Sequence, residues 1–78
     1  MLKEDFIFSY EAMAQLEDMG IYFGDINTKS YKELTAFYYV SSDGKYTKDE
    51  ILKAIMGGKI PITVAEVIDN YVNDGSKK

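Results

Sequence analysis

The segment Asp43–Glu50 comes closest to a metal site in this chain. Its carboxylates and hydroxyls lie between two predicted helices, and Glu50 would be the bidentate last ligand of an EF-hand calcium loop. Counting back from Glu50, the first and third ligand positions fall on Tyr39 and Ser41, so the leading carboxylate is missing. We therefore interpret the segment as a turn at Asp43-Gly44 followed by a helix cap, and we predict no metal and no cofactor.

Side chains that could perform catalysis are scarce. The 78 residues include no Cys and no His, which removes the cysteine nucleophile and the commonest general base. Acidic pairs such as Glu17-Asp18 and Asp49-Glu50 remain, but they fall on polar helix faces or caps, whereas a catalytic carboxylate needs a pocket that shifts its pKa. The sequence thus predicts a protein that is not an enzyme.

The charge balance restricts the class of partner. Nine Lys against 13 Asp and Glu give a net charge of -4, and the lysines do not cluster in the sequence. Such a chain repels phosphate backbones and anionic lipids. Apolar runs such as Ile21–Phe23 are far shorter than a membrane span. We expect neither nucleic acid nor membrane as a partner, and a cytoplasmic location.

Aromatic side chains are abundant, with seven Tyr and four Phe. We expect about half of them in the core and the others on a protein-binding surface, because Tyr and Phe are enriched at protein interfaces. The residues assigned to partner binding are Tyr22, Phe23, Phe37, Tyr38 and Tyr39. Because a domain of this size is only marginally stable alone, self-association into a homo-oligomer is also compatible with the sequence.

Four helices are expected to position these side chains. Three hydroxyl residues are each followed three residues later by Glu, the pattern of a capping box at a helix start: Ser30–Glu33, Thr47–Glu50 and Thr63–Glu66. Apolar residues at helical spacing predict helices at 9–19, 31–41, 48–57 and 64–73.

These helices form one all-α domain over residues 1–74, followed by a disordered tail at 75–78. The structural alternative is a compact four-helix domain that also has a short N-terminal β-hairpin, pairing residues 6–10 with 21–24. That alternative exists because Phe6, Phe8 and Tyr10 alternate with other residues, as side chains on one face of a strand do.

The order of these segments resembles the small tail assembly chaperones of long-tailed bacteriophages. In that family an aromatic-x-aromatic segment runs into a helix that a Gly ends, which is similar to Phe6-Ile7-Phe8 and the residues up to Gly20. A Ser-capped, aromatic-rich helix then resembles residues 30–39, a Thr-x-x-Glu helix resembles residues 47–51, and a last amphipathic helix resembles residues 64–72. The resemblance covers nearly the whole chain.

The resemblance implies a specific function in the cytoplasm of a bacterial host. Such a protein binds the phage tape-measure protein, keeps this long helical client soluble and recruits tail-tube subunits. Helix-in-groove recognition would suit that client. The alternative from another class is a small acidic phage-encoded inhibitor of a host or defence enzyme, whose binding would weaken steeply with salt. A calcium-dependent EF-hand-like adaptor is the third alternative.

Overall fold

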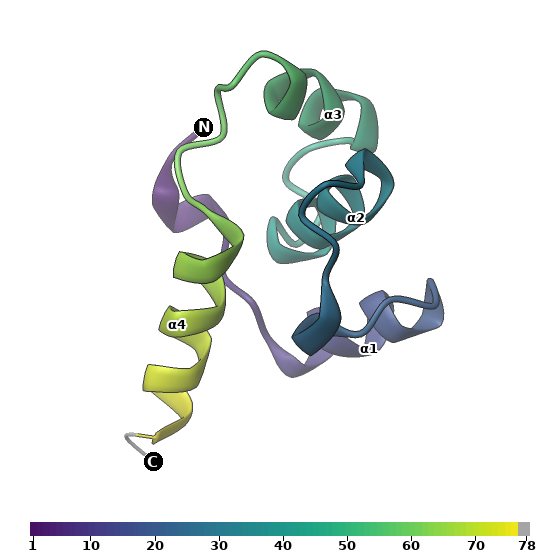
Figure 1. Ribbon diagram of the computed structural model, residues 1–78. Coiled ribbons are helices and arrows are strands. Elements are labelled where there is room, and N and C mark those ends of the chain that lie inside the picture. Colours follow the sequence, from purple (N-terminus) through teal and green to yellow (C-terminus); the bar gives the residue numbers. More distant parts are fainter. Residues whose placement is uncertain (77–78) are drawn as a thin grey trace.

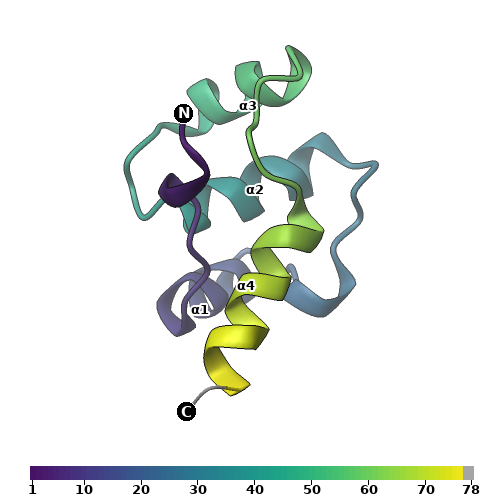
Figure 2. The same ribbon diagram turned by 90° about the vertical axis from the view of Figure 1, so that its left-hand side faces the viewer.

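The computed structural model describes residues 1–76, with side chains through residue 73. Its helices are α1 (Tyr10–Asp18), α2 (Tyr31–Ser41), α3 (Lys48–Met56) and α4 (Val64–Ser76), joined by segments that include two short 3-10 turns, η1 (Lys3–Asp5) and η2 (Phe23–Asp25). Helix α2 lies between α1 and α3 and contacts all three of the other helices (Figures 1 and 2). The predicted all-α fold of four helices is confirmed.

The helix starts follow the predicted capping chemistry. In α3 the Glu50 N–H donates to Thr47 Oγ1 at 3.1 Å, and the Thr47 N–H donates to Glu50 Oε1 at 2.9 Å. The same reciprocal pair forms at the start of α4 between Thr63 and Glu66. At α2 only half of the predicted box forms, because the Glu33 carboxylate accepts from the Asn27 N–H instead.

The helix ends differ from the prediction mainly in α4. The ends of α1, α2 and α3 lie within one residue of the predicted positions. After α3 the chain turns at Gly58, whose φ of 67° is in the left-handed region that favours glycine. Helix α4 continues to Ser76, past the predicted end at residue 73. The predicted tail at 75–78 thus overlaps this helix, and its last two residues lie outside the described residues.

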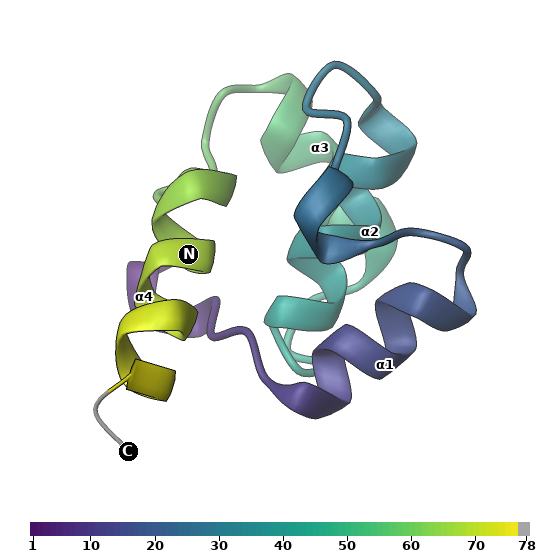
Figure 3. The ribbon, with the colours of Figure 1, turned by 60° about the horizontal axis from the view of Figure 1, so that its bottom comes forward.

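The alternative β-hairpin is wrong, since no strand occurs within residues 1–76. The segment of residues 6–9 is extended, as its alternating pattern indicated, with Phe6 and Phe8 buried and Ile7 exposed. Its backbone bonds to the end of α2 rather than to residues 21–24, because the Ile7 N–H donates to the Ser41 carbonyl at 3.0 Å. The segment then enters α1 after running beside α4 (Figures 1 and 3).

Each helix contributes one large apolar side chain that is less than 2% exposed to a shared core. These residues are Leu16, Phe37, Ile51 and Val67, in chain order. Phe8 stacks on Phe37 with 5.4 Å between ring centroids, which ties the extended N-terminal segment to the central helix α2. The N-terminal segment is therefore part of the core and is held in place beside α4.

A carboxylate fixes the start of that segment. Asp5 accepts hydrogen bonds from Lys45 Nζ at 2.6 Å, from Tyr46 Oη at 2.5 Å and from the Leu2 N–H at 2.8 Å. Lys45 and Tyr46 follow the predicted turn, where Asp43 and Gly44 have φ values of 54° and 79°. The segment Asp43–Glu50, which was considered above as a calcium loop, thus holds the N-terminal segment at Asp5 through Lys45 and Tyr46.

This contact should make stability depend on acidity. The hydrogen bonds from Lys45, Tyr46 and Leu2 hold the pKa of Asp5 below its ordinary value of 3.8. A carboxyl group whose pKa is lowered by folding stabilises the fold above its unfolded pKa, and this stabilisation is lost as the pH falls. We expect the unfolding free energy, measured in urea, to fall more steeply between about pH 5 and pH 2 in the wild type than in Asp5→Asn. If the unfolding free energies of the wild type and of Asp5→Asn depend equally on pH, this role of Asp5 is contradicted.

Candidate protein-binding site

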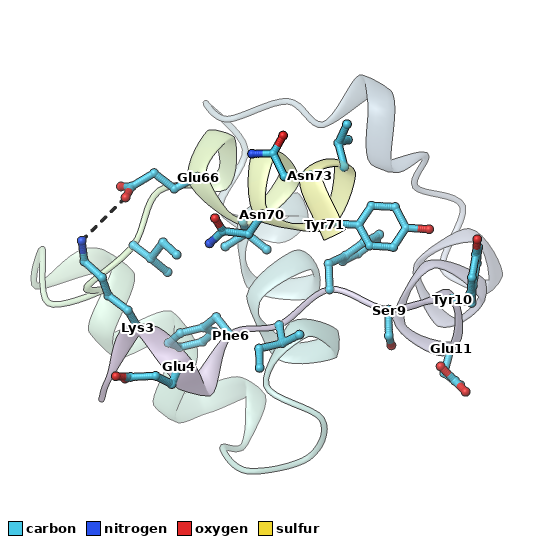
Figure 4. Close-up of a pocket in the computed structure, with 15 residues that line it drawn as sticks. Lys3, Glu4, Phe6, Ser9, Tyr10, Glu11, Glu66, Asn70, Tyr71 and Asn73 are labelled. Carbon is cyan, nitrogen blue, oxygen red and sulfur yellow. Dashed lines mark ion pairs between the residues drawn. The ribbon is translucent and has the colours of Figure 1, made fainter. Parts of the chain in front are cut away.

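A groove of about 1050 Å³ lies between the N-terminal segment and α4, and is called the α4 groove below (Figure 4). Eight residues between Lys3 and Glu11 form one wall. Ile62 and six residues of α4 form the other, among them Glu66, Val67, Asn70 and Tyr71. The walls are more than 50 positions apart in the sequence, so the groove exists only in the folded chain.

Aromatic rings form one end of the groove. The Tyr71 ring meets Phe8 edge-on at 5.3 Å between centroids, and it also packs against Phe23 at 5.9 Å and Tyr10 at 6.1 Å. Figure 4 shows Tyr71 and Tyr10 at this end and the ion pair of Lys3 with Glu66 at the other. Perpendicular ring pairs at these distances are favourable, so these contacts stabilise the aromatic end of the groove.

The charge of the groove is acidic on balance. Glu4, Glu11 and Glu66 line it, against the single ammonium group of Lys3. Lys3 Nζ lies 3.7 Å from Glu66 Oε2. The pKa of Glu66 is lowered, first by the hydrogen bond from the Thr63 N–H and then by the charge of Lys3. Glu66 therefore stays ionised at neutral pH, and the groove favours a cationic partner.

Three large apolar side chains are exposed along this groove. Ile7, Tyr10 and Val72 line it and are 66%, 76% and 51% exposed. Single exposed apolar residues are common on monomeric proteins, but several around one concave surface are typical of a protein-binding site. The α4 groove combines such residues with an aromatic end and a polar rim, which is the usual composition of an interface.

The structure corrects the assignment of Phe37 and Tyr38 to partner binding. Both are core residues, with 0% and 5% exposure. The hydroxyl of Tyr38 donates a buried hydrogen bond to the Ile62 carbonyl at 2.8 Å. Burial, and to a smaller extent the charge of Glu66, raises the pKa of Tyr38 above its ordinary value. A partner cannot reach either ring in this conformation.

The other three assigned residues do not gather in one place. Tyr22 is exposed, while Phe23 is half-buried and packs on Tyr71 at the aromatic end of the groove. Tyr39 is also half-buried, and its ring lies 5.3 Å from Lys48 Nζ. Their binding roles stay predictions, and only Phe23 adjoins the α4 groove.

Sequence reasoning missed Ile7, Tyr10 and Tyr71. A signal for Ile7 was present, because a large apolar residue between Phe6 and Phe8 in an extended segment must point to the opposite face. Tyr71 continues the apolar stripe of α4, and helical spacing alone does not distinguish a core side chain from one that lines a groove.

The hydrogen bond of Tyr38 should be needed to position α4. Ile62 directly precedes the cap residue of α4, so the bond at 2.8 Å ties the start of this helix to α2. Tyr38→Phe leaves the buried Ile62 carbonyl without this donor, and we expect a loss of about 1–2 kcal/mol in unfolding free energy. Tyr22→Phe, at an exposed position, is the control and should change stability by less than about 0.5 kcal/mol. Equal effects in urea denaturation would exclude the anchoring role.

No protein-family model, curated protein or solved structure matches this chain. No helix within the described residues is long and apolar enough to cross a membrane. Residues 1–76 also contain no group of three or more His, Cys, Asp or Glu placed to hold a metal ion. The function is therefore inferred from the surface of the chain itself.

Proposed function

We propose that this chain is a non-enzymatic protein-binding protein that holds an apolar helical segment of its partner in the α4 groove. The observation that carries the proposal is the presence of exposed Ile7, Tyr10 and Val72 around one groove of about 1050 Å³. A helix of a partner can lay its apolar face on such a surface, with side chains at helical spacing as anchors. The aromatic end then receives the largest anchor.

The charges on the groove specify the polar side of that partner. Glu4 and Glu11 are exposed. Among the described residues that line the groove, the only ion pair is the one between Lys3 and Glu66. A helix with Lys or Arg beside its apolar face would complement these carboxylates. Charge complementarity of this kind contributes to the association rate and to the choice of partner more than to affinity.

The resemblance in segment order supports a named class of partner. We propose the tape-measure protein of a long-tailed phage as the client, with tail-tube subunits recruited to the complex in the host cytoplasm. A long helical client of this class presents repeated apolar faces, and the α4 groove would cover one of them at a time. This step depends on the resemblance, whereas the groove proposal does not.

Two synthetic helices test the groove proposal. One carries Leu on one face and Lys on the other, and the second carries Leu and Glu in the same pattern. Titrated into the isotope-labelled chain, the Leu/Lys helix should shift the amide signals of Ile7 and Tyr71 and bind about fivefold more tightly than the Leu/Glu helix. Binding of both helices with shifts confined to other faces would overturn the proposal. If salt abolishes binding and no apolar contact is detected, the result would favour the alternative function, a small acidic inhibitor of a host or defence enzyme.

The DNA beside the gene tests the named client. Chaperones of the resembled family are encoded immediately upstream of a very long, helix-rich tape-measure gene, so such a reading frame is the expected neighbour. Its product, co-expressed with this chain, should stay soluble and purify with it. A short, unrelated neighbouring gene would exclude the tape-measure client and leave the groove proposal in place.

A further inference from the structure

An ion pair joins the two walls of the α4 groove at its charged end. Lys3 Nζ, on the wall formed by the N-terminal segment, lies 3.7 Å from Glu66 Oε2, on the wall formed by α4 (Figure 4). Both side chains are accessible, with 64% and 50% exposure. An exposed ion pair contributes little to stability, because water solvates both charges and screens their attraction. Such a pair can be exchanged for a similar one at small cost.

The start of α4 orients the Glu66 carboxylate. Its Oε1 atom accepts from the Thr63 N–H and from the Thr63 hydroxyl, each at 3.3 Å, and the Glu66 N–H donates to Thr63 Oγ1 at 3.1 Å. This capping box leaves Oε2 as the atom that interacts with Lys3. Glu4 and Glu11, the other carboxylates that line the groove, form no ion pair with any residue that the structure describes. Glu66 is thus the groove carboxylate with a fixed orientation.

The position of Lys3 depends on its neighbour Asp5. The Asp5 carboxylate accepts three hydrogen bonds, two of them from side chains that follow α2, so the backbone around Lys3 is held in place. The Lys3 side chain is flexible and mostly exposed, and its ammonium group can leave Glu66 without any movement of the backbone. Lys3 therefore occupies the place where a cation of a partner would meet the oriented carboxylate.

We propose that Lys3 is a built-in competitor of the partner. Its ammonium group occupies Glu66 in the free chain, and a lysine or arginine of the bound helix displaces it. This inference rests on the proposed function, because it names the contact that a cationic helix makes at the charged end of the α4 groove. Displacement exchanges one ion pair for another of the same kind, so Lys3 weakens the binding of a cationic helix, and its removal strengthens that binding.

The variant Lys3→Gln removes the competitor. Titrated with the Leu/Lys helix in a calorimeter, it should bind about threefold more tightly than the wild type, which is the usual size of one exposed charge contact. Lys29→Gln is the control, since it changes the net charge equally at an exposed position outside the groove. It should bind as the wild type does within about 1.5-fold at physiological salt, because distant charges are screened. Equal tightening in both variants would show a long-range charge effect and overturn the proposal.

A double-variant cycle tests whether Lys3 acts through Glu66. Glu66→Gln keeps an oxygen for the cap and removes the charge, so it should weaken binding of the Leu/Lys helix about threefold. In this background Lys3→Gln should change binding less than about 1.5-fold, because the pair no longer exists. In the Glu11→Gln background Lys3→Gln should still tighten binding about threefold. Equal effects of Lys3→Gln in both backgrounds would overturn the assignment of Glu66.

The acidity of Glu66 gives a readout that does not depend on affinity. The hydrogen bond from the Thr63 N–H and then the charge of Lys3 lower the pKa of Glu66. Lys3→Gln should therefore raise this pKa in the free chain, followed by carboxyl NMR signals, and leave it unchanged in the saturated complex, where the cation of the helix has replaced Lys3. A pKa that rises equally in both states would show that no displacement occurs.

The outcomes separate this inference from the proposed function. If the Leu/Lys helix does not bind at the α4 groove of the wild type, both proposals fail. If the helix binds there and shifts the amide signals of Ile7 and Tyr71, but Lys3→Gln binds it no more tightly than the wild type does, the groove proposal stands and the competitor role of Lys3 is overturned.

Discussion

Replacing Phe37 by Ala is expected to remove a large part of the stability of the domain. The ring is fully buried on α2, the helix that contacts all the others, and it packs against Phe8 at 5.4 Å and Tyr38 at 5.6 Å. Truncation of a core Phe to Ala costs about 3–5 kcal/mol, whereas a chain of this size has roughly 4–12 kcal/mol of total stability. We expect the thermal midpoint to fall by at least about 12 °C, measured by circular dichroism.

An exposed aromatic residue is the control for this prediction. Tyr22 is 68% exposed, so Tyr22→Ala should change the unfolding free energy by less than about 0.5 kcal/mol. The same pair of variants decides whether Phe37 acts in the core or at a surface. A Phe37→Ala protein that keeps its helicity and thermal midpoint but loses a partner would restore the original assignment to binding.

The helices could be predicted because their signals are local. A hydroxyl at the cap and a Glu three residues later satisfy backbone donors within one turn, so Thr47 and Thr63 mark the starts of α3 and α4 without knowledge of the rest of the fold. Gly58 likewise ends its helix through its own backbone conformation. Such signals do not depend on which face of the helix becomes buried.

Whether each aromatic residue is buried or exposed could not be predicted in the same way. Phe37 and Tyr38 are adjacent, so they point in directions about 100° apart around α2, and whether both are buried depends on the width of the buried face of this helix. Both are buried because α2 contacts α1, α3 and α4. Apolar residues on several sides of a helix are equally compatible with a central position and with a partner, and only the tertiary structure separates these cases.

The candidate site could not be predicted from the sequence, for a related reason. The α4 groove joins residues 3–11 to residues near the other end of the chain, and no pattern within either segment indicates that they meet. Its ring contacts, such as Phe8 with Tyr71 at 5.3 Å, depend on how α4 crosses the N-terminal segment. The extended conformation of that segment could be predicted, but the surface beside it could not.

Ile7→Lys is expected to weaken strongly the binding of a basic, apolar helix to the α4 groove. Ile7 is 66% exposed, so the substitution leaves the core intact. It removes an apolar contact of the groove and places an ammonium group where the proposed partner carries its own cations. Loss of a central interface residue commonly costs about 2 kcal/mol or more, so we expect binding of the Leu/Lys helix to weaken at least about thirtyfold by calorimetry.

Met56→Lys is the matched control, because Met56 on α3 is also 66% exposed and does not line the groove. It introduces the same charge and removes an apolar side chain of similar size. The two variants should have equal thermal midpoints within about 2 °C, since exposed positions rarely affect stability. If both variants weaken binding equally, the partner responds to net charge alone. If only Ile7→Lys weakens binding, the apolar wall of the α4 groove is the contact surface. An inhibitor that binds by charge alone would not need such a wall.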